Sequence, residues 1–126
     1  MTEGSLITDV RELSARASVI DLKGDVTASA EKALADAYTR ASGKFTRTIV
    51  LNFEHVDYIN STGIALIVGL LARARTERRS ISACGLIDHY REIFQITRLS
   101  DFMEIHPDED SAAGAPAAAG NTGRQS

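Results

Sequence analysis

The sequence predicts a single α/β domain with a mixed β-sheet of four to five strands and with helices packed mainly on one face. Short apolar stretches rich in β-branched residues alternate with segments whose apolar residues recur at helical spacing. The chain of 126 residues is long enough for one modest hydrophobic core, and 44% of its residues are hydrophobic. The expected order β-β-α-β-α-β-α-β implies that most strands are parallel and that the first two pair directly.

Two strands are expected at the start of the domain. Residues 7–13 form a weak strand, and residues 17–23 form a stronger one because they are richer in apolar and β-branched side chains. Gly24 and Asp25 are a typical turn pair, which we expect to end the second strand.

A helix is expected after this turn. Thr27 or Ser29 can cap its first turn with a side-chain oxygen. Gly43 lies where a helix C-terminus favours glycine. A continuous apolar stripe of mostly small residues predicts close packing on the sheet, and it consists of Ala30, Ala33, Leu34, Ala37, Tyr38 and Ala41.

The central stretch predicts a strand, a polar connection and a second helix. Residues 49–51 form a short buried strand, and a connection from Asn52 to Asn60 leads into the helix. Apolar residues of this helix recur at i, i+3, i+4 and i+7, so we expect that face to pack on the sheet. Its members are Ile64, Ile67, Val68 and Leu71.

The last part of the domain predicts a strand, a helix and a further strand. Residues 80–85 form a short strand in which Cys84 is expected to be buried as a small apolar residue. Asp88 is the expected N-cap of a third helix that continues to Arg98. Residues 101–105 form the last expected strand.

The two ends of the chain differ in composition from the domain itself, which is expected to span residues 6–106. Residues 1–5 are expected to be frayed. Residues 107–126 contain no large apolar residue and predict a flexible low-complexity tail. The acidic run at residues 108–110 is interpreted as solvated charge on that tail and not as a metal site.

Charge and composition exclude several classes of partner. The formal net charge of -3 and the absence of tryptophan make a nucleic-acid partner a poor prediction. The longest apolar run, residues 64–72, is too short to cross a bilayer, so no membrane partner is expected. The polar N-terminus lacks the features of a signal peptide, and a cytoplasmic location is therefore expected.

The motifs of common enzyme classes are missing from the sequence. It contains no P-loop, no dinucleotide-binding glycine motif and no complete GxSxG serine motif. His55, His89 and His106 lack the spacing of metal ligands, so neither a metal nor another cofactor is expected. A hydrolase that uses Ser61 as nucleophile and one of these histidines as base stays open as a less favoured alternative.

Ser61 has the most chemical interest because it lies where the loop enters the central helix. In a structural interpretation, its oxygen accepts a hydrogen bond from a free backbone N–H at the helix N-terminus. In a functional interpretation, a phosphate on Ser61 faces unpaired N–H groups and the positive end of the helix dipole. Such a modification would change the surface while leaving the fold intact.

The same helix predicts a docking surface. An apolar spot beside a glycine and a modifiable serine is typical of a surface whose binding can be switched. If the expected core face packs on the sheet, the residues on or near the opposite side are Thr62, Leu66, Gly69, Leu70 and Arg73.

The stretch from Val50 to Ile64 resembles the signature of STAS domains, the anti-sigma factor antagonists of bacteria. That signature has a hydrophobic strand, a short loop with a valine, an aromatic-Ile pair and Asp-Ser-Ser-Gly-Leu at a helix start. The likeness extends over residues 7–105 and includes Gly24 and Asp25, where the family commonly has Gly-Glu-x-Asp. The resemblance implies a single domain of STAS type.

The resemblance also implies a function. In this family the serine that corresponds to Ser61 is phosphorylated by a partner that is both anti-sigma factor and serine kinase. The unphosphorylated form binds this partner and releases the sigma factor, phosphorylation breaks the complex, and a serine phosphatase restores it. The chain would then be a binding module and not an enzyme. The residues expected at the partner surface are Asp25, Asn60, Ser61, Thr62, Gly63, Leu66, Gly69, Leu70 and Arg73.

The chain departs from the family motif at two positions. Asn60 stands in place of the aspartate and Thr62 in place of the second serine, so the motif lacks its carboxylate. Asp25 is the candidate to cover part of that role. The alternative function is a STAS subunit of a stress-signalling scaffold or of a transporter complex, in which Ser61 is structural.

Overall fold

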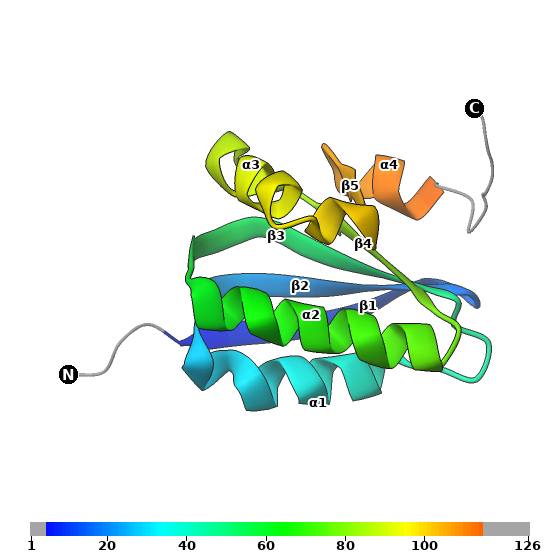
Figure 1. Cartoon of the computed structure of the whole chain (residues 1–126). Helices are drawn as coiled ribbons and strands as arrows, with labels where there is room; N and C mark the ends of the chain where they lie inside the picture. The colour runs from blue at the N-terminus through cyan, green and yellow to red at the C-terminus, as the bar shows by residue number, and fades with distance from the viewer. Residues whose placement is uncertain (1–4, 115–126) are drawn as a thin grey trace.

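The computed structural model describes residues 5–114, which form one layered α/β unit (Figure 1). The elements in chain order are β1 Leu6–Ser14, β2 Ala17–Val26, α1 Glu31–Ala41, β3 Thr48–Ile59, α2 Ser61–Thr76, β4 Ser80–Cys84, α3 Asp88–Ile96, β5 Glu104–His106 and α4 Glu109–Gly114. Short 3-10 turns at Ala28–Ala30 and Leu99–Asp101 precede α1 and follow α3.

The five strands form one mixed sheet in the order β1-β2-β3-β4-β5. β1 and β2 pair antiparallel, whereas β2, β3, β4 and β5 pair in parallel with their neighbours. The parallel strands are connected through helices, as parallel pairing requires. The predicted α/β class and the mixed sheet are therefore confirmed.

α1 and α2 lie side by side along one face of the sheet (Figure 1). Their buried side chains share one core with alternate residues of the strands, such as Ile49, Leu51 and Phe53 of β3. The predicted stripe of α1 is confirmed, because all its members are buried except Ala33, which is partly buried. α3 extends this core, since the Phe94 ring packs edge-on against Phe53 with 5.8 Å between the ring centroids.

The strands β2 and β3 are longer than the sequence predicts. β2 continues through Gly24 and Asp25, so the predicted turn is wrong. Gly24 instead adopts a φ of 110° where the pairing register between β2 and β3 shifts. A Cβ at Gly24 would lie 2.2 Å from the backbone carbonyl oxygen of Ser5. β3 likewise continues to Ile59, so the predicted polar connection is a strand whose backbone pairs with β2. Pairing with a neighbouring strand thus extends β3 past the point where its apolar run ends.

Several predicted helix ends differ from those in the structure. The Thr27 side chain makes no capping hydrogen bond and instead contacts the hydroxyl of Ser29. At the other end of α1, Ser42 is the C-cap in an extended conformation, so no left-handed cap at Gly43 is used.

The structure also corrects the predicted ends of α3 and the position of the last strand. Asp88 is the first residue of α3 and not its cap, because Ile87 occupies the cap position. α3 ends at Ile96, and the chain then turns at Arg98, whose φ is 68°. The 3-10 turn that follows moves the last strand to Glu104–His106.

The segment predicted as a tail contributes α4, which packs on the sheet face opposite to α1 and α2. Ala112 is fully buried against Val19, Val50 and Cys84. The prediction of a flexible segment from residue 107 is therefore wrong for Glu109–Gly114. The rest of that segment, and the predicted frayed residues 1–4, lie outside the described residues.

Burial of Cys84 is confirmed, since its side chain is 1% exposed. Removal from water disfavours the thiolate and raises the pKa of this thiol to about 11.

A network of ion pairs holds α4 against β1 and β2. The Arg11 guanidinium lies 2.5 Å from a carboxylate oxygen of Asp21 and 2.5 Å from one of Glu109. Asn52 donates a further hydrogen bond of 2.9 Å to Asp21. The acidic run predicted to be solvated therefore includes Glu109, which forms part of this network.

The network predicts a pH-dependent contribution to stability. The hydrogen bond from Arg11 lowers the pKa of Asp21 below its usual value. The stabilisation is therefore present above the unfolded pKa of about 3.9 and is lost as the pH falls through the lower folded pKa. We expect Asp21→Asn to lower the free energy of unfolding by about 1 kcal/mol at pH 7, because the pair is partly exposed. In urea denaturation this difference should shrink as the pH falls through the lowered pKa of Asp21.

Candidate functional site

The candidate site is the N-terminus of α2, where β3 passes into the helix through Asn60. The Asn60 backbone is extended, with φ -107° and ψ -178°, and its side-chain oxygen accepts a hydrogen bond of 2.8 Å from the Gly63 N–H. Asn60 is therefore the N-cap, and the interpretation of Ser61 as the cap is wrong. Asparagine caps as well as aspartate does, so the replaced motif position keeps this structural role.

Gly63 brings the start of α2 close to the end of β2. A Cβ at Gly63 would lie 1.9 Å from the carbonyl oxygen of Val26, so no other residue fits without a shift of the backbone. Asn60 donates its backbone N–H to the same oxygen at 3.3 Å. This contact fixes both the position and the rotation of α2 relative to the sheet.

Ser61 occupies the first helical position, and its side chain and that of Thr62 are exposed. Among the described residues, no side chain is hydrogen-bonded to the Ser61 hydroxyl, and no partner accepts the backbone N–H groups of Ser61 and Thr62. The hydroxyl is thus accessible from solvent beside two free donors at the positive end of a helix of 16 residues. Among the described residues, no histidine is hydrogen-bonded to this hydroxyl in the way that an activated serine nucleophile pairs with its base.

The core face of α2 differs from the predicted one. The residues that pack inward are Gly63, Ile67, Leu70 and Ala74. Val68, which was predicted to be buried, is 47% exposed. Leu70, which was predicted to lie on the surface, is only 6% exposed. Leu66, predicted to point away from the sheet, is partly buried against the core.

One stripe of α2 faces solvent, and we call it the α2 face. It consists of Ser61, Thr62, Ala65, Val68, Gly69 and Ala72. Most of its side chains are small, and a Cβ at Gly69 would meet no atom within 4 Å. Val68 supplies the one large apolar side chain, so the α2 face carries mostly small side chains and a single apolar spot about two helical turns from Ser61. Ala65, Val68 and Ala72 were not predicted to lie on this surface, because the expected core face of α2 was a different one.

Arg73 points toward α1 and not onto the α2 face. Its guanidinium lies 4.3 Å from the centroid of the Tyr38 ring, donates a hydrogen bond of 3.1 Å to Thr39 and pairs with Glu77 at 3.5 Å. These contacts connect the two helices. The structure therefore places Arg73 in the scaffold, away from Ser61.

Acidic and aromatic residues lie beside the helix N-terminus. Asp25 on β2 is paired in register with Tyr58 on β3, three residues before Ser61. Asp25 is partly buried, whereas Asp57 is exposed and Tyr58 is 50% exposed. The C-terminal ends of β2 and β3, which precede α1 and α2, thus carry two carboxylates and one accessible aromatic ring.

Tyr90 of α3 supports the strand end that leads into the site. Its hydroxyl accepts a hydrogen bond of 3.1 Å from the backbone N–H of Ile59, the last residue of β3. This bond helps to fix the strand end from which Asn60 and Ser61 follow. This role of Tyr90 could not be predicted from the sequence, since a hydrogen bond between residues 31 positions apart produces no local pattern.

The capping role of Asn60 leads to a first mutational prediction. Asn60→Ala removes the acceptor for the Gly63 N–H, and we expect it to lower the free energy of unfolding by about 1 kcal/mol. Asn60→Asp keeps the acceptor and should leave stability within about 0.5 kcal/mol of the wild type. Thermal or urea denaturation of both variants checks the assignment. Equal loss of stability in the two variants would contradict it.

Neither a membrane-crossing helix nor a metal site is found in residues 5–114. The helices of this part of the chain are too short or too polar to cross a bilayer. No group of three histidine, cysteine, aspartate or glutamate side chains in the same part is arranged to hold a metal ion.

A family model described as "Mlab, STAS domain" matches residues 10–105. The chain belongs to the STAS domain family. The matched span contains all five strands in whole or in part and includes the N-terminus of α2 with Ser61. The resemblance on which the sequence analysis relied is therefore confirmed.

Two relatives illustrate how this STAS domain compares with curated proteins. It is 36% identical over 61 residues to the anti-sigma-B factor antagonist of Staphylococcus aureus, an alignment that covers 48% of this chain. The chain spans about half the length of that relative, with 56% covered. It is also 30% identical over 97 residues to the putative anti-sigma factor antagonist BtrV of Bordetella bronchiseptica, with 77% of this chain and 81% of the relative covered.

Solved structures share the fold of this STAS domain. An anti-sigma factor antagonist from Mycobacterium paratuberculosis has a TM-score of 0.73 at 18% identity, with 86% of this chain and 91% of that chain covered. The antagonist SpoIIAA in its unphosphorylated form has a TM-score of 0.63 at 17% identity, with 85% of this chain and 94% of that chain covered. SpoIIAA of Bacillus is also known in a phosphorylated form. That structure has a TM-score of 0.59 at 18% identity, with 83% of this chain and 96% of that chain covered.

Proposed function

We propose that this STAS domain is an anti-sigma factor antagonist that is switched by phosphorylation of Ser61. The observation that carries this proposal is the free, exposed Ser61 hydroxyl at the first position of α2, on the α2 face. The names of the relatives support the class of partner. The partner is then an anti-sigma factor with serine kinase activity, and a serine phosphatase reverses the modification. Such a protein acts in the cytoplasm, where bacterial transcription takes place.

The scaffold can carry a phosphate on Ser61 without unfolding. Because Asn60 and not Ser61 caps the helix, modification of the serine removes no hydrogen bond that holds α2. The free N–H groups of Ser61 and Thr62 and the helix dipole stabilise negative charge at this point. The modification therefore acts on the surface and not on the fold.

The added phosphate would oppose binding of the partner. It adds about -1.5 to -2 charges to a surface that already carries Asp25 and Asp57 near the C-terminal ends of β2 and β3. A partner that covers the α2 face must then bury this charge near two carboxylates. Such burial is costly unless the partner supplies new cationic groups.

The proposed contact surface differs from the predicted one in its members. We keep Asp25, Asn60, Ser61, Thr62 and Gly69, and we add Ala65, Val68 and Ala72 of the α2 face. Gly63 and Leu70 are buried, and Arg73 is engaged with α1, so these residues act through the scaffold. Leu66 is partly buried and lies at the margin of the surface. The proposed role is binding and not catalysis.

The decisive experiment is phosphorylation by the cognate kinase. The full chain is incubated with ATP and each candidate anti-sigma kinase from the same genome, and the products are analysed by mass spectrometry. We expect one phosphate, located on Ser61, with one of the kinases. Ser61→Ala should abolish the modification, whereas Thr62→Ala, its exposed neighbour, should leave it intact.

Two outcomes would count against the proposal. Phosphate that remains after Ser61→Ala would place the modification elsewhere. A partner that binds the wild type and Ser61→Asp with equal affinity would instead favour a STAS subunit with a structural serine.

A further inference from the structure

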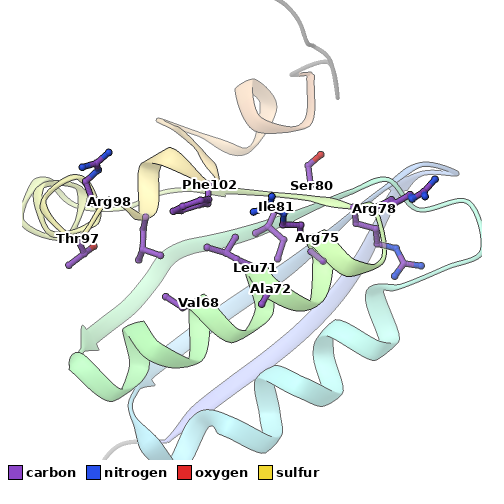
Figure 2. Close-up of a pocket in the computed structure, with 13 residues that line it drawn as sticks. Val68, Leu71, Ala72, Arg75, Arg78, Ser80, Ile81, Thr97, Arg98 and Phe102 are labelled. Atoms are coloured by element: carbon purple, nitrogen blue, oxygen red, sulfur yellow. The ribbon is translucent and has the colours of Figure 1, made fainter.

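A groove lies between the C-terminal half of α2 and the segment that connects α3 to β5 (Figure 2). It has a volume of about 700 Å³ and passes over the start of β4. Its apolar lining includes Leu71 of α2, Ile81 of β4, and Leu99 and Phe102 of the connecting segment. Figure 2 shows the Leu71 side chain and the Phe102 ring directed toward the same space.

The groove exposes apolar surface that the fold itself does not cover. Phe102 is 64% exposed and Val68 is 47% exposed, and both line this one groove. A contiguous exposed apolar lining is characteristic of a surface that binds a ligand or partner. The volume lies within the range of roughly 300–1,000 Å³ that is typical of small-molecule sites.

The charges that line the groove are all positive. Four arginines line it and no acidic side chain does, although the whole chain has a formal net charge of -3. Arg79 is engaged with Glu77 and with the Thr46 carbonyl, and Arg98 pairs with Asp101 at 2.7 Å.

The other two arginines form no ion pair with any residue in the described part of the chain. These are Arg75 in the last turn of α2 and Arg78 immediately after it, both of which are exposed. Two guanidinium groups without counter-ions beside an apolar lining are complementary to a ligand that has a hydrocarbon body and an anionic head.

We propose that the groove binds one molecule of a single-chain alkyl carboxylate. The hydrocarbon chain lies against Leu71 and Phe102, and the carboxylate accepts hydrogen bonds from Arg75 and Arg78. A small ligand is favoured over an acidic protein segment, because the volume of the groove suits one such molecule. The groove shares Val68 and Ala72 with the α2 face, but Arg75 and Arg78 lie at the opposite end of α2 from Ser61. The inference therefore goes beyond the proposed antagonist function and does not depend on it.

Calorimetric titration of the full chain with three amphiphiles of equal chain length tests the proposal. The probes are decanoate, decyltrimethylammonium and decyl maltoside, each below the concentration at which it forms micelles. We expect decanoate to bind at one site, at least about tenfold more tightly than either other probe. Backbone amide shifts in the NMR spectrum should map this binding to Leu71, Ile81 and Phe102.

Variants separate the contributions of the head group and the chain. Arg75→Gln combined with Arg78→Gln should weaken decanoate binding about tenfold or more, and Phe102→Ser should weaken it as well. Arg40→Gln removes a positive charge from an exposed position of α1 and should leave the affinity unchanged.

Three results would overturn the proposal. The first is a lack of decanoate binding, and the second is equal affinity for the three probes. The third is self-association in sedimentation experiments that Phe102→Ser abolishes, which would assign the groove to a contact between copies of the chain.

Discussion

Ser61→Asp is expected to weaken binding to the cognate anti-sigma factor by at least about a hundredfold while leaving the fold intact. Full phosphorylation should cost about 3–4 kcal/mol of binding free energy, which corresponds to several hundredfold. The loss follows because the new charge must be buried near Asp25 and Asp57. An acidic residue at the first position of α2 interacts favourably with the helix dipole, so the melting temperature should stay equal or rise slightly.

Calorimetric titration with the kinase identified in the phosphorylation assay provides the measurement. Ser61→Ala should bind as the wild type does, because this hydroxyl makes no hydrogen bond to a described side chain. Ala35→Asp places the same charge on an exposed position of α1 and should bind normally. Undiminished binding of Ser61→Asp would refute the switch, and unfolding of Ser61→Ala would refute its independence from the fold.

Gly63→Ala is expected to be among the most destabilising single methyl additions in this protein. The added Cβ would lie 1.9 Å from the Val26 oxygen and 2.7 Å from its carbonyl carbon, so the start of α2 must move away from β2. We expect a loss of about 3 kcal/mol in the free energy of unfolding, at the upper end for overpacking. The melting temperature should fall by roughly 10–20 °C for a domain of this size.

Gly69→Ala is the matched control, because it makes the same change in the same helix. A Cβ at Gly69 would meet no atom within 4 Å, and alanine is a better helix former than glycine. This variant should therefore be about 0.5–1 kcal/mol more stable than the wild type. Urea denaturation of both variants measures the difference, and similar effects of the two changes would contradict the close contact between α2 and β2.

The local patterns of the sequence predicted most of the fold and the location of the site. Apolar strands, the α1 stripe and the order of elements all follow from side-chain periodicity, which a single segment displays without its neighbours. The short motif from Asn60 to Gly63 was sufficient to locate a helix N-terminus with an accessible serine. It did not reveal which residue caps that helix, since both Asn60 and Ser61 have side chains that can do so.

The rotation of α2 could not be predicted from its own sequence. Residues 63–72 are apolar or glycine throughout, so several faces of the helix satisfy the same periodicity. The close contact between Gly63 and Val26 selects one of them, and it turns Leu70 inward and Val68 outward. The composition of the α2 face therefore depends on a contact between residues 37 positions apart, counted from 26 to 63.

The sequence by itself determined the alternation of strands and helices and the presence of a modifiable serine at a helix start, because these depend on neighbouring residues. The tertiary structure decided how far β3 extends, which side of α2 faces solvent, and that α4 packs on the sheet. Each of these outcomes depends on a segment that is distant in the sequence. Pairing with β2 extends β3, and the contact with Val26 sets the rotation of α2. Contacts with Arg11, Val19 and Val50 hold α4 on the sheet. Contacts between segments far apart in the chain produce no periodic pattern in the sequence of either segment, so they are seen only in the folded structure.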